Sequence, residues 1–411
     1  SAAAAATAGS TSGAAEATSA PPHMAPSVGA SGSPHSQPLR LGQKLFAAVD
    51  ERKQVAAVAV SADGLCMVSG DASGSLQLWA RASASAEWVA ATRMVACRDA
   101  GENEPSVNAL ALRGTTLLSG AMDGGVKSWR AKVDLDERRG IEPNLYPLRT
   151  MQAESGHQPG HGVMCVALCA DDGPGPANEW AASGGQDNRV VIWNLKTAAA
   201  TQRHLRHRAG GWVMAVDIAY LPQERARQLQ PAAPMAHGAM LVLSGGFDGA
   251  CTLWLAEATL VDGDLMPGRF AKHRELSPPT VQEADALLSV SLCATRGLAA
   301  SGANGGALRV WCLAASDATP VTQETAHEKG ICALRWRGPL GEELVSSGED
   351  GACKRWSIDE PAEGSNAPTL RVLQTLEVQR EAEVMGLAAV ASTAEVACAL
   401  SDGSLQMLAI P

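Results

Sequence analysis

Aromatic side chains are scarce in this chain, and one kind dominates them. They make up only 4% of the 411 residues, with ten tryptophans against two tyrosines and three phenylalanines. Apolar residues still reach 46%, an ordinary share for a chain that builds a globular core. Because the composition is otherwise normal, the excess of tryptophan indicates that this residue fills a particular, recurring position.

Long apolar runs and an excess of positive charge are also missing. No apolar run approaches the roughly 18–20 residues that a membrane-spanning helix needs, so we expect a soluble protein without membrane insertion. The formal net charge of −10 repels phosphate backbones and acidic lipid surfaces. Nucleic-acid binding is therefore disfavoured.

One basic cluster runs against this net charge. It consists of Arg203, His204, Arg206, His207 and Arg208. A run of this kind usually lies on the solvated outer strand of a sheet, and that is the prediction here. Contact with a nucleic acid through Arg203, Arg206 and Arg208 is the alternative.

The ten cysteines lack the paired CxxC spacing of a zinc ribbon or a redox site, and they are spread too widely for a small disulfide framework. Five of them fall inside apolar, strand-like runs: Cys66, Cys251, Cys332, Cys353 and Cys398. We expect reduced, buried thiols, which favours an intracellular protein, with the cytoplasm as the first choice.

One metal hypothesis comes from His157, His161, Cys165 and Cys169, which fall four residues apart. On a helix this spacing would line up four zinc ligands on one face. Proline and glycine between the histidines, and the strand-like run after them, argue against a helix. We expect a histidine-bearing loop followed by core cysteines, with no metal and no cofactor.

Residues 1–38 differ from the rest of the chain. They are rich in Ala, Ser, Gly and Pro, with one acidic residue and neither Lys nor Arg. Such a segment buries too little surface to offset its ordering entropy, so we expect a flexible tail before a domain at 39–411. A remnant of an organellar presequence is the alternative, and it would place the protein in an organelle.

A repeated frame explains the tryptophans. A serine stands ten residues before a tryptophan in six segments, which end at Trp79, Trp129, Trp193, Trp254, Trp311 and Trp356. A seventh copy has Leu408 in place of the tryptophan, and successive copies are 50, 64, 61, 57, 45 and 52 residues apart. A constant frame at variable spacing indicates one structural unit that carries loops of different lengths.

Each unit has the pattern of paired antiparallel strands. An apolar run ends at Ser-Gly, a turn such as Asp-Gly follows, and an alternating strand leads to the tryptophan. A further strand precedes this hairpin, with apolar residues three and then two positions apart, as at Val163, Val166 and Leu168. A weaker fourth strand follows most of the tryptophans. Four short strands repeated seven times predict a β-propeller.

These units resemble WD repeats, and the resemblance covers about residue 39 to the end of the chain. The Trp-Asp pair of that family is absent, and Trp193-Asn194 comes nearest to it. The resemblance implies an all-β fold, a seven-bladed β-propeller of four-stranded antiparallel blades. It also implies that a strand within 39–49 completes the last blade, because the seventh unit ends at its third strand.

His327, Ser346 and Asp350 could form a hydrolase triad, but the repeat favours a structural role. A catalytic nucleophile is unique in its chain, whereas Ser346 has equivalents in five other units. The resemblance implies a buried hydrogen-bonded network of His, Ser, Asp and Trp instead. At the family spacing only the sixth unit carries the full set, which is His327, Ser346, Asp350 and Trp356. We expect no catalytic residues.

Partner binding is expected where the units differ. Five insertions would all lie on one face of the propeller: Ala131 to Asn144, Cys169 to Glu179, Tyr220 to Ala239, Ala256 to Gly268 and Asp359 to Thr369. Either they pack against a partner or they accumulate where they do no harm. By the resemblance, the opposite face docks peptides around the channel mouth. There it would present Met122, Gln186, Phe247 and Glu349.

The sequence therefore predicts a non-catalytic scaffold for protein–protein interactions, a subunit of a larger assembly with several protein partners and no small-molecule substrate. Two alternatives stay open. One is an accessory or catalytic enzyme subunit that uses the channel mouth, and the other is a nucleic-acid-binding propeller.

Overall fold

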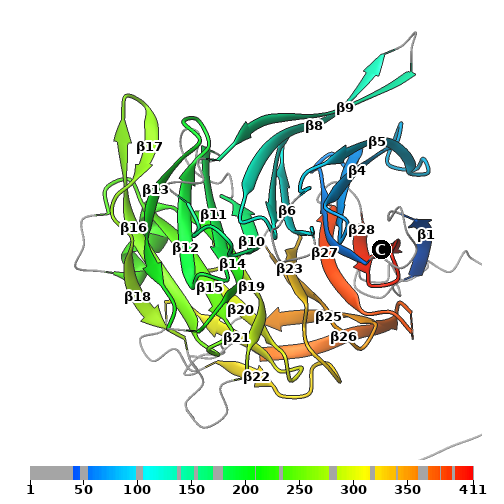
Figure 1. Cartoon of the computed structure of the whole chain (residues 1–411). Helices are drawn as coiled ribbons and strands as arrows, with labels where there is room; N and C mark the ends of the chain where they lie inside the picture. The colour runs from blue at the N-terminus through cyan, green and yellow to red at the C-terminus, as the bar shows by residue number, and fades with distance from the viewer. Residues whose placement is uncertain are drawn as a thin grey trace, which may run out of the picture. The chain divides into compact units, whose positions relative to one another are not determined.

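Strands dominate the computed structural model, which describes residues 40–46, 54–98, 105–136, 140–151, 156–169, 179–208, 210–230, 235–276, 285–314, 320–338, 341–359, 369–379, 381–390 and 394–410 (Figure 1). The segment 1–38, for which the sequence predicts a flexible tail, lies outside the described residues. In each repeat the alternating apolar residues form neighbouring antiparallel strands, and the glycine-bearing turns connect them.

The strands form seven antiparallel sheets, each built from one repeat. The first three blades are β2 (Val55–Val60), β3 (Cys66–Asp71), β4 (Ser75–Ala80) and β5 (Val89–Val95); β6 (Val107–Arg113), β7 (Thr116–Ala121), β8 (Val126–Asp136) and β9 (Gly140–Thr150); and β10 (Val163–Leu168), β11 (Trp180–Gly185), β12 (Arg189–Asn194) and β13 (Ala199–Arg206). The fourth blade is β14 (Val213–Leu221), β15 (Ala239–Gly246), β16 (Cys251–Val261) and β18 (Ala271–Glu275), with β17 (Asp264–Pro267) paired to the far half of β16.

The remaining blades follow the same order. The fifth and sixth are β19 (Leu287–Cys293), β20 (Leu298–Ala303), β21 (Leu308–Cys312) and β22 (Val321–Gln323); and β23 (Ala333–Arg337), β24 (Glu343–Ser347), β25 (Ala352–Asp359) and β26 (Thr369–Glu377). The seventh is β27 (Val384–Val390), β28 (Glu395–Leu400), β29 (Ser404–Ala409) and β1 (Arg40–Phe46).

The first strands of the seven blades contact one another in a closed circle, from β2 through β6, β10, β14, β19, β23 and β27 back to β2. The sequence prediction of a seven-bladed propeller is therefore confirmed.

The order of the strands within each blade defines two faces of the propeller. The turn face carries the turns between second and third strands and the connections from one blade to the next. The insertion face carries the connections between first and second and between third and fourth strands.

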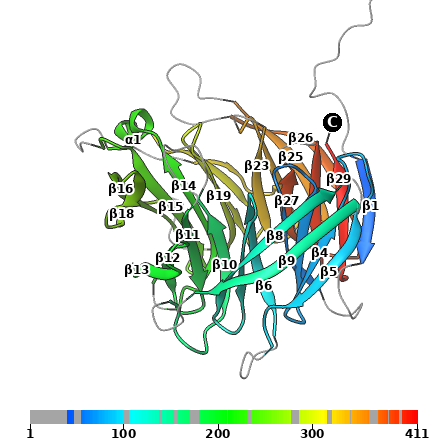
Figure 2. The same cartoon turned by 90° about the horizontal axis from the view of Figure 1, so that it is seen from above.

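The ends of the chain close the ring, as predicted. Figure 2 shows β1 beside β29, and the two strands pair antiparallel from Arg40 opposite Ala409 to Phe46 opposite Ser404. Leu45 is buried against Leu405 and Met407, and Lys44 Nζ forms an ion pair with Asp402 at 3.0 Å. This pairing covers an edge of β29 that would otherwise expose its backbone N–H and C=O groups.

Neighbouring blades meet at the glycine of the Ser-Gly frame. A Cβ atom on Gly70 would lie 2.6 Å from Val107 Cγ1, and one on Gly120 would lie 2.6 Å from Val163 Cγ1. Gly184, Gly245 and Gly302 face the first strand of the following blade in the same way. Glycine is required at these positions because the next blade packs directly onto its Cα atom.

The five insertions all lie on the insertion face, but they are not all loops. Ala131 to Asn144 extends β8 and β9 into a long hairpin that reaches past the rest of its blade (Figure 1). Ala256 to Gly268 forms the β16–β17 hairpin, and Tyr220 to Ala239 contains helix α1 (Gln223–Leu229). The centres of the other two insertions lie outside the described residues.

The β16–β17 hairpin ties the fourth blade to the third. Trp180 Nε1 donates to the Leu265 carbonyl at 2.8 Å, and Lys196 Nζ pairs with Asp264 at 2.8 Å. Gln202 bonds both the Gly268 carbonyl and the Phe270 N–H. This insertion therefore packs within the propeller.

Replacing Leu45 by alanine should test the closing strand. Leu45 is only 7% exposed, whereas Leu41 on the same strand is 53% exposed. We expect Leu45→Ala to lower the free energy of unfolding by about 2–4 kcal/mol through lost burial and a cavity. Leu41→Ala should leave it within about 0.5 kcal/mol. Urea unfolding of both variants would measure this, and equal losses would contradict a packed closing strand.

Candidate functional site

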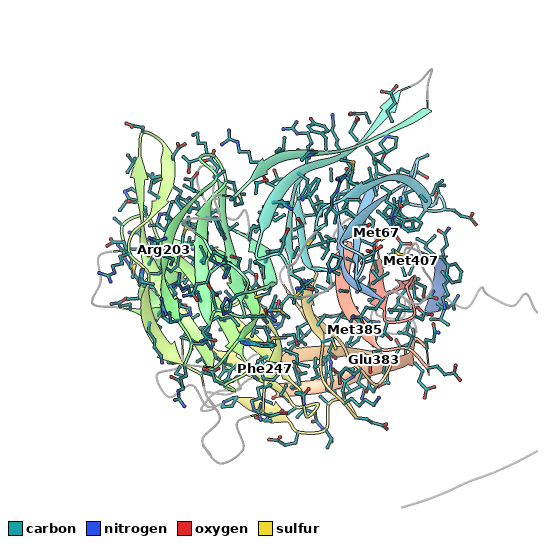
Figure 3. The ribbon with its side chains drawn as sticks, viewed as in Figure 1. Met67, Arg203, Phe247, Glu383, Met385 and Met407 are labelled. Atoms are coloured by element: carbon teal, nitrogen blue, oxygen red, sulfur yellow. The ribbon has the colours of Figure 1, made fainter. Side chains whose placement is uncertain are left out.

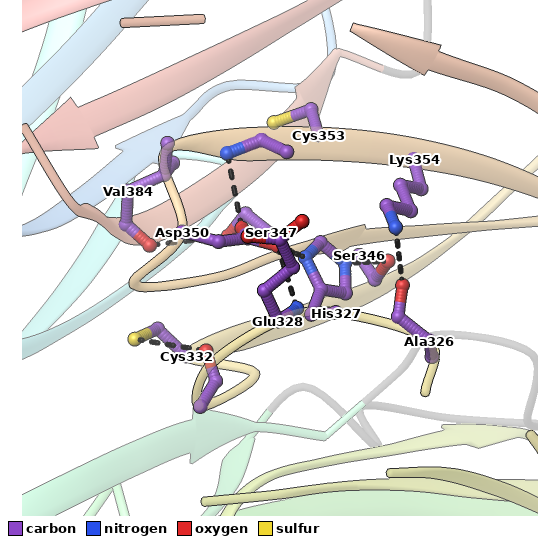
Figure 4. Close-up of polar contacts among 12 residues, drawn as sticks. Ala326, His327, Glu328, Cys332, Ser346, Ser347, Asp350, Cys353, Lys354 and Val384 are labelled. Carbon is purple, nitrogen blue, oxygen red and sulfur yellow. Dashed lines mark hydrogen bonds and ion pairs between the residues drawn. The ribbon is translucent and has the colours of Figure 1, made fainter. Parts of the chain in front are cut away.

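The side chains of His327, Ser346, Asp350 and Trp356 form one chain of hydrogen bonds. Trp356 Nε1 donates to Ser346 Oγ at 2.8 Å. Ser346 Oγ in turn lies 2.7 Å from His327 Nε2 (Figure 4). His327 Nδ1 lies 3.0 Å from both Asp350 oxygens. Because the indole N–H occupies Ser346 Oγ as a donor, the hydroxyl hydrogen can go to His327 Nε2, and Nδ1–H then donates to Asp350.

The expectation that only the sixth blade has this network was wrong. In the third blade His157 bonds Asp187 at 2.8 Å and Ser183 at 2.7 Å, and Trp193 donates to Ser183. In the fourth blade the corresponding residues, joined by the same contacts, are His207, Asp248, Ser244 and Trp254. Both histidines are buried.

Loop length explains why these two sets were missed. His327 stands four residues before the first strand position Ile331, whereas His157 and His207 stand six residues before Val163 and Val213. The two extra residues close a small turn with Gly160 or Gly210 at φ +81°. In that turn the Gly211 N–H donates to the Arg208 carbonyl. A search for histidine that tolerates such a glycine turn would find all three networks.

The other blades keep only part of the network. Trp79 donates to Ser69 and Trp129 donates to Ser119, at 3.0 and 2.9 Å. In the fifth blade the buried Ser301 Oγ and Trp311 Nε1 have no hydrogen-bond partner within the described part of the chain. That repeat has Asn304-Gly305 where the sixth has Glu349-Asp350, so the aspartate is missing.

The network has the bond order of a hydrolase triad but not its accessibility. Ser346 is completely buried and His327 is 2% exposed, so no substrate can reach the hydroxyl. Burial alone would raise the pKa of Asp350, but the hydrogen bond and charge of His327 and two backbone N–H donors lower it to about 2. A carboxylate held in its charged form by these donors stabilises the fold.

The four residues of the zinc hypothesis lie in different surroundings and do not form one site. His157 belongs to the network, Cys165 and Cys169 are buried, and burial raises the pKa of the Cys165 thiol. His161 lies apart, with Nδ1 3.4 Å from the Pro159 carbonyl. Among the described residues no group of three or more His, Cys, Asp or Glu side chains could hold a metal ion.

A ring of seven equivalent residues surrounds the channel mouth on the turn face. Each follows the second strand of its blade and donates its backbone N–H, at 2.8–3.0 Å, to the carbonyl at or just before the start of the first strand. This mouth ring consists of Ala72, Met122, Gln186, Phe247, Asn304, Glu349 and Ser401. The backbone is thus the same in every blade while the side chain changes. All four sequence-predicted partner-facing residues belong to it.

The mouth ring has an aromatic sector and an acidic sector. Phe247 is 50% exposed, and its ring meets Trp212 edge-on with centroids 5.7 Å apart. Glu349 lies near Glu383, since both carboxylates raise the pKa of the half-buried Cys332 after burial itself. Phe247 and Glu383 are labelled in Figure 3. The carboxylates of Glu349 and Glu383 have no hydrogen-bond or ion-pair partner in the described residues.

Sequence reasoning missed Trp212 and Glu383, although a signal for them existed. Their carbonyls accept the N–H groups of Phe247 and Ser401 in the bond that defines the mouth ring. Each therefore stands directly before the first apolar residue of its first strand, Val213 or Val384, a position that can be read in every repeat. Gly162 lies between Met122 and Gln186. Its N–H donates to Gln186 Oε1 at 2.8 Å, and a Cβ atom on it would lie 2.7 Å from Met122 Sδ.

The basic cluster lies on and after β13, the outer strand of the third blade (Figure 3). Arg203 and Arg206 are exposed, while Arg208 Nη2 contacts Glu275 at 3.3 Å. His207 is buried in its network, and His204 Nε2 lies 2.8 Å from the Phe270 carbonyl. Three of its five residues, His204, His207 and Arg208, thus already make contacts within the propeller.

Comparison with known proteins agrees with this architecture. The family model "WD domain, G-beta repeat" matches residues 147–194, the end of β9 through β12. The angio-associated migratory cell proteins of Homo sapiens and Pongo abelii are each 23% identical to this chain over 320 residues. The alignment covers 77% of this chain and 60% of those relatives, so the chain spans less than two thirds of their length.

Seven antiparallel sheets closed into a ring by the first and last strands define the protein as a β-propeller. The repeated Ser–Trp frame is similar to that of WD repeats, and the WD-repeat family model matches the segment 147–194. Propellers of this family generally mediate protein–protein interactions and are typically non-catalytic. None of the helices within the described ranges has the length and apolar content to cross a lipid bilayer.

Removing the serine hydroxyl should separate the complete network from the incomplete one. Ser346→Ala leaves Trp356 Nε1 and His327 Nε2 unpaired, so we expect the free energy of unfolding to fall by about 1–3 kcal/mol. Ser301→Ala is the matched control, because its hydroxyl is already without a partner in the described structure. Denaturant unfolding should show a loss for Ser346→Ala only, and an equal loss in both variants would contradict a stabilising network.

Acid should remove the contribution of Asp350. Its pKa in the folded protein is about 2, below the ordinary value of 3.8. A lowered pKa stabilises the fold fully above the unfolded value, and this stability is lost as the pH falls through the folded value. The stability difference between the wild-type protein and Asp350→Asn should therefore be constant above about pH 5 and shrink between about pH 4 and pH 2. Urea unfolding across this range measures it, and a constant difference would refute the assignment.

Proposed function

We propose that this protein is a non-catalytic scaffold subunit of a multiprotein assembly, and that its mouth ring binds a basic, partly apolar segment of a partner protein. The observation that carries the proposal is the pairing of an exposed aromatic sector with unpaired carboxylates at one channel mouth. Aromatic rings supply contact area at low entropic cost and attract cations, and the carboxylates attract Lys and Arg.

The charges of the turn face favour a basic partner. Its cations are largely used within the propeller: Lys44 pairs with Asp402, Lys127 with Asp123, Arg93 with Asp71 and Arg208 with Glu275. Glu349 and Glu383 have no such partner in the described residues. Glu328, whose N–H donates to Asp350, is exposed, and so is the next residue, Lys329. The net field at this sector is acidic.

The insertion face supplies a second surface for assembly. The β8–β9 hairpin projects from the second blade and has solvent on its outer strand, where Tyr146 and Leu148 are each 43% exposed. Pro143 and Pro147 lie on the same strand and limit further strand pairing along its edge. An assembly subunit that binds one partner at the mouth can thus contact another through this hairpin.

The two alternative functions receive less support. An enzyme subunit using the mouth would need an accessible nucleophile or acid–base pair, and the Ser-His-Asp sets are buried. A nucleic-acid-binding propeller would use Arg203, Arg206 and Arg208, but Arg208 already contacts Glu275 and the net charge is −10. All ten cysteines are free, which fits an intracellular, cytoplasmic site of action.

Binding of labelled peptides tests the mouth ring directly. A fluorescein-labelled peptide rich in Arg, Lys and Leu should raise its fluorescence anisotropy with the wild-type protein, while a peptide with Glu in place of the basic residues should not. Glu349→Gln combined with Glu383→Gln, and separately Phe247→Ala, should weaken binding about tenfold, which corresponds to about 1.4 kcal/mol. Glu87→Gln, an exposed carboxylate on the insertion face, is the control and should bind normally.

The same variants test the scaffold role in cell extract. Proteins captured by the wild-type chain and by Glu87→Gln should be depleted from the captures made with Phe247→Ala. Binding of the acidic peptide as well as the basic one, or identical captures by all variants, would refute a basic-segment site at the mouth.

A further inference from the structure

A β-bulge interrupts the first strand of six blades at the same place. In the third blade Val163 lies opposite Gly185 and Cys165 lies opposite Gly184, so Met164 between them is an extra residue without a partner on the second strand. The same shift of register occurs in the first, second, fourth, fifth and seventh blades. A bulge redirects one side chain out of the regular alternation of its strand, and such bulges are frequent beside binding sites.

The six bulge residues and their equivalent in the sixth blade form a ring inside the central channel, which the first strands of all seven blades line. This collar consists of Ala56, Asn108, Met164, Met214, Leu288, Cys332 and Met385. Six of them line the half of the channel nearer the turn face, and the seventh, Met164, has its Sδ 3.9 Å from Asn108 Nδ2. All seven are half-buried, so the collar stays open to a ligand.

Flexible apolar side chains dominate the collar. Three of its seven residues are methionines, whose unbranched and polarizable side chains adapt to the shape of an apolar ligand. Asn108 is its one amide, and Nδ2 already donates to the Val163 carbonyl at 2.9 Å. Burial and nearby carboxylates raise the pKa of Cys332 to about 12, so its thiol is neutral. The seven collar side chains therefore carry no charge.

The collar adjoins the acidic sector of the mouth ring. A Cβ atom on Gly330 would lie 2.8 Å from Leu288 Cδ1 and 3.1 Å from Glu349 Cδ, so the leucine and the carboxylate lie side by side. Cys332 feels the charges of both Glu349 and Glu383. Figure 3 labels Met385 of the collar together with Glu383, which stands two residues before it. A ligand that carries a cation next to an apolar side chain can therefore contact both surfaces at once.

The volume of this half of the channel limits the size of the apolar group. It has a cavity volume of about 120 Å³. An apolar cavity of about 150 Å³ takes up benzene, so the collar has room for one aliphatic side chain but not for an indole ring. Among the described residues, the one charged side chain of this wall is Arg335, which lines both halves of the channel and interacts with the charge of Asp217.

We propose that the collar binds one leucine or methionine side chain of the partner segment, next to the basic residue that the acidic sector attracts. This inference rests on the proposed function, since the mouth ring and the collar would hold neighbouring residues of the same segment. A side chain without a branch at Cβ reaches past the mouth ring, whereas valine and isoleucine are shorter and stiff at χ1. The collar thus selects among the basic segments that the mouth attracts.

A series of fluorescein-labelled basic peptides tests this selection by fluorescence anisotropy. The peptides share one sequence of Arg, Lys and Gly and differ at a single central position, which is Leu, Met, Ala or Trp. Leucine and methionine should bind about equally well, because they have similar volumes. Alanine should bind about tenfold more weakly or worse, since it buries much less apolar surface. Tryptophan should also bind more weakly than leucine, because it does not fit the cavity.

An exchange of size between protein and peptide tests the collar itself. Met385→Ala enlarges the cavity, so the leucine peptide should lose affinity and the tryptophan peptide should gain it. Met94→Ala is the matched control, because Met94 is a half-buried methionine on β5, the outer strand of the first blade. It should bind every peptide as the wild-type protein does. Circular dichroism and thermal unfolding show that the variants are folded, and Met214→Ala replaces Met385→Ala if the latter is not.

The outcomes separate this inference from the proposed function. If Glu349→Gln combined with Glu383→Gln leaves binding of the leucine peptide unchanged, the mouth site is wrong and the collar proposal falls with it. If binding depends on both carboxylates but the wild-type protein binds the leucine, alanine and tryptophan peptides equally, the mouth site stands and the collar proposal is overturned. Identical peptide preferences in Met385→Ala and Met94→Ala would overturn it as well.

Discussion

The close approach of each blade's second strand to the first strand of the next blade is the contact on which the ring depends. At Gly70, Gly120 and Gly302 there is no room for a Cβ atom, because a β-branched side chain of the following blade fills that space. The serine before the glycine lies on the same strand, and Ser69 and Ser119 accept the N–H of their tryptophan there, whereas Ser301 has no such bond in the described structure. One dipeptide thus fixes both the packing between blades and the hydrogen bonding within a blade, and this accounts for its recurrence at variable spacing.

With the backbone fixed in this way, the side chains at the two ends of the channel are free to differ. On the turn face the same N–H to C=O bond presents alanine, methionine, phenylalanine or glutamate without changing the backbone. On the insertion face arginines reach neighbouring blades: Arg296 donates to the Gly341 and Ile358 carbonyls, and Arg337 donates to Ile410. Several donors on one planar group let a single side chain bond two carbonyls, which a lysine cannot do with the same geometry.

The sequence predicts the fold because the Ser-Gly, Asp-Gly and Trp positions recur in register, so seven blades follow from counting, and the resemblance to WD repeats implies the closing strand. It predicts the candidate site less completely. His157 and His207 escape a fixed-spacing search because two residues of loop were added at Gly160 and Gly210. The hairpin form of two insertions depends on pairing between segments whose strand pattern is weak. Met214 and Met385 line the same channel only after seven blades have closed, so no local pattern brings them together.

The distribution of complete networks also bears on how the mouth can respond to a partner. The third, fourth and sixth blades hold the loop before their first strand through a buried histidine and aspartate. The fifth blade lies between two of them, and its Ser301 and Trp311 have no hydrogen-bond partner in the described structure. Its loop is instead held at the surface, where Asp285 accepts the Gly305 N–H. This blade stands between the aromatic and the acidic sector of the mouth ring, so opening of its loop would break fewer buried hydrogen bonds than opening of the loop in either neighbouring blade.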